Sequence, residues 1–461
     1  MLLTDDNAAA PHLPAGTLSG IARRHLVPGA QLAIHHAGLT RVWETGELEI
    51  GTGRRVTTDA VFPIGSITKC FTATVAMMLV ADGDVDPDGP VTEHVPEVGE
   101  PGRALTLRQL LSHTSGLADM PGLDGTTSPT LRRYVASQVR GSNVVLPPGA
   151  AFSYSTLGYT LAGRVIEAVT GMPWADAVES LLLRPLGIGA AFTVPPRAGE
   201  TRRPGATGHS ASAATGRVRP VRQSAGPAVA PAGGLALSAA DLVRFGVLHL
   251  GHGPACLLTE AAASQMRQPV PRTQAYGLAD AWGMGFALYR QQAADWAGHD
   301  GNADGTSCYL RIAPAGGWVA ALTSNANTGA ALWRDLQAEL ARAGVPIDPP
   351  RDPSADVPAA PPASAAGRYA NGDLACEITA DGNGHLHMSM DGGDTMPLTP
   401  HADLTFSVAD PESAQPLFGG RFVRDPATGR IHGMQAGGRF SRRYPPAPAA
   451  PTAGQHLAQG G

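Results

Sequence analysis

The sequence predicts a two-part fold, a large α/β domain followed by a small antiparallel β-barrel. The chain has 461 residues, which is too long for one ordinary hydrophobic core. Apolar helical patterns alternate with apolar strands over residues 1–345, as in an α/β layout. After a stretch rich in Pro and Ala, residues 367–447 show short alternating runs between Gly and Asp turns, which is typical of a small antiparallel barrel.

Regular elements follow one another closely in the first half of the α/β domain. The apolar run after Phe62–Lys69 predicts a helix to about Asp82, which stops at Gly83 because glycine commonly ends helices. Residues 51–55, composed of Gly, Thr and Arg, look disordered. Spacing of apolar residues predicts further helices at 18–26, 105–111, 129–139, 158–170 and 174–183, and strands at 30–36 and 40–50.

The second half of this domain contains a long irregular stretch, residues 195–232, with six arginines against Glu200 alone. Loops of this length are usually functional or disordered. We expect a solvated surface, with docking of an acidic partner as the alternative. Ser238–Asp241 resembles a capping box and predicts a helix to Leu250. The arginines are Arg197, Arg202, Arg203, Arg217, Arg219 and Arg222.

Strands near both ends of the α/β domain are expected to share one sheet. The later strands are predicted at 282–289, 306–313 and 318–324, followed by a helix at 330–343. These patterns divide the chain into a large α/β domain at 1–345, a semi-rigid Pro/Ala linker at 346–366, the barrel at 367–447 and a disordered tail at 448–461. Barrel strands are predicted at 376–378, 385–390, 404–408, 422–423 and 431–434.

Composition excludes several classes of function. A net charge of −5 and a pI near 6.3 give no general attraction to nucleic acid or anionic membrane. Residues 1–12 lack the layout of a secretory signal, and no stretch approaches the roughly 20 apolar residues of a membrane helix. The four cysteines lack metal-type spacing, so we expect buried free thiols in a cytoplasmic protein. They are Cys70, Cys256, Cys308 and Cys376.

One candidate for chemistry is Ser66-x-x-Lys69 at the start of the predicted helix. Residues three apart share a helix face, so the hydroxyl and the amine can meet. The helix N-terminus adds unpaired N–H groups and partial positive charge, which favour an alkoxide and a nearby oxyanion. This geometry is typical of an activated nucleophile. Alone the pattern is common, and an ordinary N-terminal serine with an exposed lysine is the competing interpretation.

Two further motifs accompany this pair. Tyr154-Ser155-Thr156 offers a phenol in a turn after Pro-Pro-Gly, and Gly298–Asn302 (Gly-His-Asp-Gly-Asn) precedes the strand predicted at 306–313. Their order resembles the penicillin-recognising serine hydrolases, which include class C β-lactamases, D,D-peptidases and related esterases. The segment 110–117 resembles another part of the same group. This resemblance covers roughly residues 15 to 345 and implies a β-lactamase/transpeptidase-like fold.

The resemblance also implies roles. Ser66 would be acylated, Lys69 would take its proton, and Tyr154 would move a proton to the leaving group and from the next nucleophile. Either Lys69 or Tyr154 can be the general base. His299 stands where many relatives have lysine, and the backbone N–H groups of Ser66 and Asn302 would form the oxyanion hole. Substrate-binding positions would be Thr156, Asp300 and Gly301, while His113 is interpreted as structural.

One departure affects the substrate. Relatives commonly have Tyr-x-Asn in the second motif, and here Thr156 replaces the Asn. The missing amide would bind a substrate carbonyl or steady Lys69, so ordinary β-lactam hydrolysis is not the expected activity. The absence of an export signal points the same way.

A catalytic domain joined to a lipocalin-like barrel resembles the penicillin-binding-protein-type thioesterases. The resemblance implies release of a nonribosomal peptide from the phosphopantetheine of a peptidyl carrier protein by head-to-tail macrolactamisation, with a D-residue at the peptide C-terminus. No cofactor of the enzyme's own and no metal are implied. Two alternatives stay open: a hydrolase of the same group (a D-stereospecific peptidase or amidase, an esterase or a β-lactamase), and a non-catalytic penicillin-recognising sensor.

Overall fold

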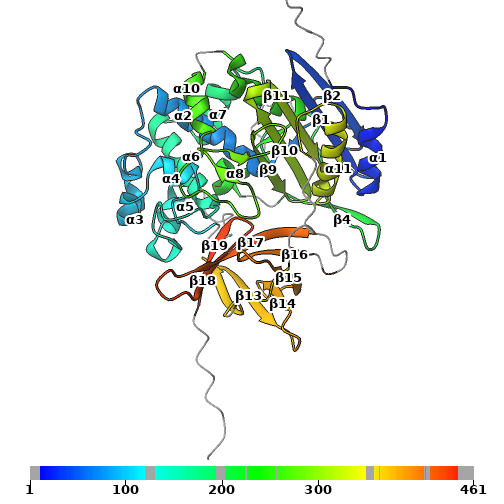
Figure 1. The fold of residues 1–461 in the computed structure, drawn as a ribbon. Coiled ribbons are helices and arrows are strands. Elements are labelled where there is room, and N and C mark those ends of the chain that lie inside the picture. The colour runs from blue at the N-terminus through cyan, green and yellow to red at the C-terminus, as the bar shows by residue number, and fades with distance from the viewer. Residues whose placement is uncertain are drawn as a thin grey trace, which may run out of the picture.

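The fold consists of a large part built on one sheet and a smaller β-barrel, seen above and below in Figure 1. The computed structural model describes residues 11–119, 130–193, 203–223, 226–254, 257–348, 358–362, 364–409, 411 and 416–444. Cys256, Arg197, Arg202, Glu200, residues 349–357 and 363 of the predicted linker, and the predicted tail lie outside the described residues. Within them, no helix is long and apolar enough to cross a membrane.

The large sheet joins strands from both ends of the α/β domain, as predicted. Its order is β2-β1-β11-β10-β9-β8-β7, and neighbouring strands pair antiparallel, with Ala30 of β1 opposite Ser324 of β11. The central strands β1, β10 and β11 are buried along almost their whole length, so both faces of the sheet need covering. The strands are β1 (Gly29–His36), β2 (Leu39–Gly46), β7 (Ala281–Trp282), β8 (Ala287–Tyr289), β9 (Trp296–Ala303), β10 (Thr306–Ala313) and β11 (Trp318–Ser324).

Helices cover the two faces of this sheet unequally. On one face α1 (Thr17–Arg24) and α11 (Gly329–Arg342) pack through Leu18, Leu332 and Leu336 against β1 and β11. On the other face lies the larger helical part with α2 (Thr68–Ala81) at its centre, visible on the left of Figure 1. Its other helices are α3 (Gly99–Arg103), α4 (Leu107–Leu111), α5 (Leu131–Gln138), α6 (Thr156–Thr170), α7 (Trp174–Val178), α8 (Ala230–Gly233), α9 (Ala239–Val247) and α10 (Glu260–Met266).

Several sequence predictions need correction. Residues 51–55 are ordered rather than disordered, because the Glu47 carboxylate accepts the Gly51 N–H (2.7 Å) and Leu48 N–H donates to the Arg54 carbonyl. The strand predicted at 282–289 is a hairpin of β7 and β8, because Gly285, at φ +101°, turns the chain between them. The stretch 195–232 contains a second hairpin, β4 (Gly208–Ser212) with β5 (Arg217–Val221).

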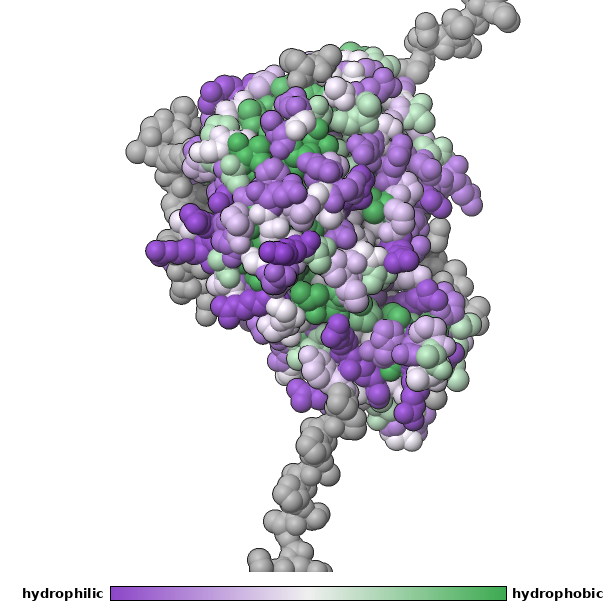
Figure 2. All heavy atoms as spheres, turned by 90° about the vertical axis from the view of Figure 1, so that its left-hand side faces the viewer, coloured by the Kyte–Doolittle hydropathy of each residue, from purple (hydrophilic) through white to green (hydrophobic). Residues whose placement is uncertain are grey.

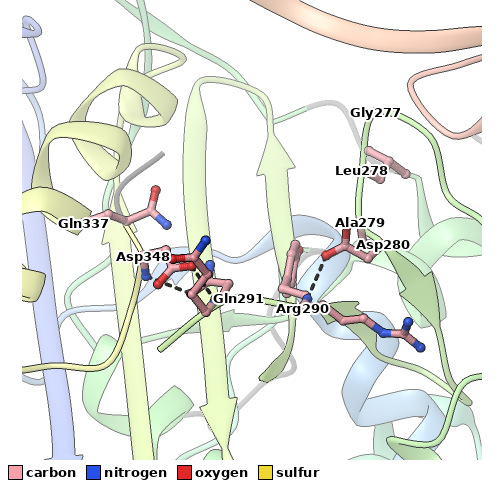
Figure 3. A pocket seen from close by; sticks show the side chains of 10 residues that line it. Gly277, Leu278, Ala279, Asp280, Arg290, Gln291, Gln337 and Asp348 are labelled. Carbon is pink, nitrogen blue, oxygen red and sulfur yellow. Dashed lines mark hydrogen bonds between the residues drawn. The ribbon is translucent and has the colours of Figure 1, made fainter. Parts of the chain in front are cut away.

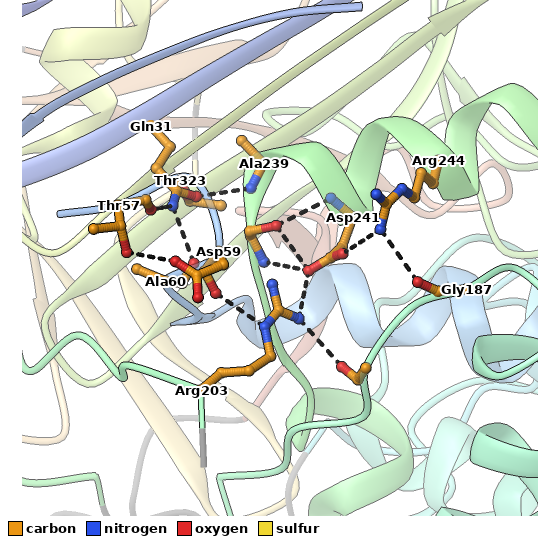
Figure 4. Close-up of polar contacts among 12 residues, drawn as sticks. Gln31, Thr57, Asp59, Ala60, Gly187, Arg203, Ala239, Asp241, Arg244 and Thr323 are labelled. Carbon is orange, nitrogen blue, oxygen red and sulfur yellow. Dashed lines mark hydrogen bonds and ion pairs between the residues drawn. The ribbon is translucent and has the colours of Figure 1, made fainter. Parts of the chain in front are cut away.

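A buried polar network holds the loop that leads to the Ser66 motif (Figure 4). The Gln31 amide on β1 donates to the carbonyls of Thr57 and Ala60, and its oxygen accepts the N–H of Ala239 at the start of α9. Arg203 reaches the buried Asp241 carboxylate at 2.7 Å and also donates to the Asp59 carbonyl. The predicted capping box at Ser238–Asp241 is present. Arg203 is therefore a structural residue, not solvated loop surface.

The C-terminal part is a closed eight-stranded antiparallel barrel, as predicted. Its core contains Tyr369, Met388, Phe406 and Phe422. Three of its strands were missed: β12 and β19 are short and rich in polar residues, and β15 contains two prolines. The strands are β12 (Gly367–Asn371), β13 (Leu374–Ala380), β14 (Leu386–Met390), β15 (Met396–Pro400), β16 (Thr405–Ala409), β17 (Pro416–Arg424), β18 (Ile431–Ala436) and β19 (Arg439–Arg443).

The barrel is fastened to the helical part by backbone and amide hydrogen bonds. Tyr154 N–H donates to the Gly438 carbonyl at 3.0 Å, and the Gln435 amide donates to the carbonyl of Phe152 at 3.1 Å. The Asn371 side chain accepts the N–H of Asp119. Figure 2 shows a mainly hydrophilic exterior on the helical side, with a hydrophobic area over the upper part and a smaller one lower down. The barrel thus grips the segment that carries the predicted catalytic tyrosine.

Candidate active site

Ser66 and Lys69 meet as the helical spacing predicted. Ser66 lies in a one-turn 3₁₀ segment (Gly65–Ile67) directly before α2, and the Lys69 Nζ is 3.2 Å from the Ser66 Oγ. Lys69 is 1% exposed and also donates to the Ala232 carbonyl at 3.0 Å. That carbonyl holds Lys69 in place in a chain that lacks the usual asparagine. The hydroxyl itself is only half-buried, so a substrate can reach it.

The charge state of Lys69 follows from its surroundings. Burial lowers its pKa from 10.5 to about 7, while the Asp119 carboxylate raises it and Arg439 lowers it. A large fraction of the amine is therefore neutral near neutral pH. Burial raises the pKa of Tyr154 above its ordinary value, against the opposing effect of a hydrogen bond with Ser66. The phenol is consequently protonated, and Lys69 is the better acceptor for the Ser66 proton.

Tyr154 is held over this pair by aromatic contacts. The Lys69 Nζ lies 5.0 Å from the centre of its ring, and the His113 ring stacks on it at 4.2 Å. His113 also accepts the Ser155 N–H through Nδ1 at 3.0 Å and is fully buried. His113 therefore has a structural role, as predicted: it fixes the Tyr154 ring and the backbone that follows it.

The third motif precedes β10, as predicted, and itself lies within strand β9. Its backbone runs against the Ser66 turn: a Cβ on Gly301 would meet the Ile64 carbonyl at 2.0 Å, and one on Gly65 would meet the Asn302 carbonyl at 2.2 Å. Only glycine permits this approach, and Gly65 also has a φ of +51°. The Ser66 and Asn302 backbones are thereby brought together, as the predicted oxyanion hole requires.

His299 faces the pocket in an uncharged state. It is 3% exposed, its Nδ1 bonds the Asp300 carbonyl at 2.5 Å, and its ring lies 6.1 Å from that of Tyr154. Burial and the nearby Lys69 lower its pKa to about 4. Its Nε2 is buried with no partner among the described residues, so it can hydrogen-bond a substrate. The neighbouring Asp300 pairs with Arg311 at 2.6 Å and also lines the cavity.

Two residues of the site had no signal in the predicted motifs. Asp119, 5% exposed, pairs with Arg439 of the barrel at 2.5 Å and accepts the Thr156 N–H at 2.7 Å. Burial alone would raise the pKa of Asp119, but Arg439 and the Thr156 N–H hold it below its ordinary value. The Arg439 guanidinium lies 5.1 Å from the centre of the Tyr154 ring. Asp119 follows the segment 110–117 by two positions, whereas nothing local marks Arg439.

These side chains line one cavity of about 460 Å³, and all eight predicted site residues except Gly301 are among its lining residues. The remainder of the wall includes Trp282 and Tyr289 of the β7–β8 hairpin and Leu278. Thr156 lines it as the first residue of α6, two residues earlier than the predicted helix start. No group of His, Cys, Asp and Glu within the described residues could hold a metal ion.

A larger cleft of about 760 Å³ lies beside this cavity and shares Leu278 and Tyr289 with it (Figure 3). Its two carboxylates already accept backbone N–H groups: Asp348 from Gln292 and Asp280 from Arg290, each at 2.7 Å. It contains no nucleophile with a base beside it. Size therefore does not identify the reactive site in this molecule; the grouping of Ser66, Lys69 and Tyr154 does.

Comparison with known proteins agrees with this geometry. The family model described as Beta-lactamase matches residues 15–344. "Penicillin-binding protein 4" of Amycolatopsis lactamdurans is 37% identical over 349 residues, which span 71% of this chain and 90% of that protein. The crystal structure of SurE is 40% identical, covers 93% of this chain and 97% of SurE, and superposes with a TM-score of 0.81.

More distant structures share the fold of the large part. D-amino acid amidase from Ochrobactrum anthropi SV3 is 25% identical, with 72% of this chain and 97% of the amidase covered and a TM-score of 0.61. A class C β-lactamase from Rhodobacter sphaeroides is 22% identical, with coverage of 71% and 99% and a TM-score of 0.59. The motifs, the fold and these similarities together place the chain in the β-lactamase family, the serine hydrolases and acyltransferases that include the penicillin-binding proteins.

Proposed function

We propose that this protein releases a carrier-bound nonribosomal peptide thioester by head-to-tail macrolactamisation. The observation that carries the proposal is the reach of the barrel into the catalytic cavity, where Arg439 pairs with Asp119 beside Tyr154. A roof of this kind excludes water and holds a long acyl chain, which a small hydrolase site does not need. The similarity to SurE covers 93% of this chain and therefore extends over both parts of the fold.

The first half-reaction transfers the acyl group to the enzyme. Ser66 Oγ attacks the thioester carbonyl and gives its proton to Lys69 Nζ, 3.2 Å away. The carbonyl oxygen becomes an oxyanion between the N–H groups of Ser66 and Asn302, worth about 3 kcal/mol per donor. The C–S bond then breaks, and the phosphopantetheine thiolate takes a proton through Tyr154 or Lys69. An ester on Ser66 remains.

The second half-reaction uses the peptide's own N-terminal amine. The amine attacks the Ser66 ester and gives one proton to Lys69 or Tyr154; the C–O bond breaks and Ser66 Oγ recovers a proton. Because both ends of the chain are held in one cavity, the effective concentration of the amine allows it to compete with water. The protonated Tyr154 and the neutral fraction of Lys69 supply one proton donor and one acceptor.

The substrate's C-terminal residue is proposed to have D configuration. Two similar proteins support this configuration, which the family resemblance implies. One is a D-amino acid amidase, and the other is SurE, which has also been crystallised with D-Leu. Thr156, Asp300 and Gly301 would contact this residue, the first two from the lining of the cavity.

The carrier protein is proposed to dock on the β4–β5 hairpin. Arg217, Arg219 and Arg222 are exposed there, and the neighbouring Gln223 lines the catalytic cavity and bonds the Asp304 carbonyl. A basic surface at the mouth suits an acidic carrier domain. Arg217→Glu with Arg219→Glu should raise KM for a carrier-bound peptide but not for the same peptide on pantetheine. Arg41→Glu, at an exposed arginine of the edge strand β2 outside the hairpin, is the matched control.

The test of the function is incubation with linear peptidyl pantetheine thioesters that differ only in a C-terminal D- or L-residue. Cyclic peptide from the D-substrate, absent with Ser66→Ala, is the expected product. Linear acid alone would refute the cyclase proposal and support the alternative, a hydrolase of this family. That alternative is favoured by the names of two relatives, a β-lactamase from Providencia stuartii and an esterase from Burkholderia gladioli, each covered only over about half its length.

A further inference from the structure

A second cavity, of about 540 Å³, lies within the barrel at the end that faces the catalytic part. We refer to it as the barrel chamber. Its wall is formed by alternate residues of the strands, which is the pattern of side chains that point into a barrel. The paired lining residues are Leu374 and Cys376 of β13, Met388 and Met390 of β14, Met434 and Ala436 of β18, and Arg439 and Ser441 of β19, and Phe418 of β17 completes the set.

The barrel chamber adjoins the catalytic cavity. Asp119, Leu278 and Arg439 line both. Because the Arg439 guanidinium is 5.1 Å from the Tyr154 ring, the shared wall stands beside the phenol that would handle the proton of an incoming nucleophile. A group at the end of the chamber next to this wall therefore lies on the Tyr154 side of the catalytic cavity.

The chemistry of the chamber selects an apolar group. Cys376, Met388 and Met434 are buried, and Met390 and Phe418 are half-buried. Burial keeps the Cys376 thiol uncharged, with a pKa of about 12. Methionines adapt to different apolar shapes, and an eight-stranded barrel has room for one small ligand.

The rim of the chamber is acidic. Asp373 and Asp391 are exposed at its edge, while the positive charge of Arg439 is matched by Asp119. Carboxylates at an opening attract an ammonium group and repel another carboxylate. An apolar side chain on a residue with a free α-amine combines both properties, and a peptide's N-terminal residue is such a group.

We propose that the barrel chamber binds the apolar side chain of the residue whose amine attacks the Ser66 ester. The proposal rests on the proposed acyl transfer and adds the location and chemistry of the acceptor. With the side chain in the chamber, the α-amine lies at the shared wall beside Tyr154. The amine forms the C–N bond and loses one proton to Lys69 or Tyr154, and the Ser66 Oγ leaves and is reprotonated.

External amines test this acceptor site without macrocyclisation. A short D-amino acyl N-acetylcysteamine thioester acylates the full-length enzyme, and glycinamide or leucinamide competes with water for the ester. We expect leucinamide to give an aminolysis-to-hydrolysis ratio at least about tenfold above glycinamide, from the apolar area that its side chain buries. Thiol release measures acylation in the same samples.

Filling the chamber should remove that preference. Met390→Phe is expected to lower the leucinamide ratio to that of glycinamide and to leave thiol release unchanged. Met396→Phe is the matched control, because Met396 is also a half-buried barrel methionine but does not line the chamber. Met390→Ala, which enlarges the chamber, should shift the preference toward tryptophanamide, and it keeps the test decisive if Met390→Phe fails to fold.

The outcomes separate the two proposals. Normal thiol release without aminolysis by any amide overturns the proposed acyl transfer to amines and the chamber's role with it. Aminolysis with no dependence on the acceptor side chain, or equal effects of the Met390 and Met396 variants, overturns the chamber alone. A change in preference that follows the acyl donor instead of the amide also overturns it, because the chamber would then hold the acyl chain.

Discussion

The floor and the roof of the catalytic cavity are built by different rules. The floor, with Ser66, Lys69 and Tyr154, comes from two helix starts of the catalytic part. The roof comes from strands of the barrel and supplies Arg439. The floor contributes Lys69 and the roof contributes Arg439, both near Tyr154. The two differ in whether a carboxylate pairs with the basic group.

Among the described residues Lys69 has no carboxylate within hydrogen-bonding distance, while Arg439 has Asp119 at 2.5 Å. Burial therefore lowers the pKa of Lys69, so that part of the amine is neutral and can act as a base, whereas Arg439 keeps its positive charge. The floor supplies groups that change protonation during the reaction; the roof supplies a fixed charge and a wall. Variants of the floor should accordingly abolish acylation, and variants of the roof should change stability and the choice of acceptor.

The largest effect is expected for Ser66→Ala on the floor. Loss of the nucleophile should reduce thiol release from a peptidyl thioester by at least about 1,000-fold and eliminate the covalent adduct in the intact mass spectrum. Ser19→Ala, at a surface serine of α1 that bonds the Gly16 carbonyl, should retain both. An adduct that persists in Ser66→Ala would show that another residue is the nucleophile.

The second effect concerns the protonation of Lys69. A protonated amine cannot accept the Ser66 proton, so kcat/KM for thiol release should be low in acid and rise with pH through about 7. The raised pKa of Tyr154 keeps the phenol protonated throughout this range. Lys69→Met should lose about 100- to 10,000-fold in rate and the rising limb as well. A wild-type profile that is flat between pH 5 and 9 contradicts Lys69 as the base.

The third effect separates the roof from the floor. Arg439→Met leaves the Asp119 carboxylate buried without its cation, which should lower the free energy of unfolding by about 3–5 kcal/mol. Thiol release should fall less than in the floor variants, and hydrolysis should gain on cyclisation. Arg442→Met, on the same strand, removes a guanidinium that bonds the Val145 carbonyl and is the control, expected below about 1 kcal/mol. Denaturant unfolding and product ratios measure both. Equal losses of stability in Arg439→Met and Arg442→Met would show that the Arg439–Asp119 pair stabilises the fold no more than an ordinary hydrogen bond.

The smallest effect on activity is expected far from the cavity. Asp241→Asn removes the charge that holds Arg203 in the network of Figure 4, at a cost of about 1–3 kcal/mol in stability and no change in kcat. Asp335→Asn, whose partner Arg24 is exposed, should cost less than about 1 kcal/mol. If Asp241→Asn instead changes kcat with unaltered stability, the network tunes the Ser66 loop rather than supporting it.

Local sequence patterns correctly predicted the features that depend on the spacing of residues within one helix or strand. Ser66 and Lys69 meet because residues three apart share a helix face, the capping box at Ser238 formed as written, and strands β10 and β11 occupy the predicted residues. Cys70, Cys308 and Cys376 are buried free thiols, as their spacing suggested. Helical periodicity and helix capping involve residues only a few positions apart, so both can be predicted directly from the sequence.

Tertiary structure decided what depends on contacts between distant segments. Asp119 and Arg439 are 320 residues apart and belong to different parts of the fold, so no local signal joins them. The segment Gly298–Asn302 lies within β9, and only the tertiary structure shows which backbones its glycines approach: Gly301 meets the Ser66 turn at Ile64, and Gly298 meets Leu310 of β10. The nucleophile and its base were written in one helical turn; the roof over them exists only because a closed barrel brings its last strand back to the cavity.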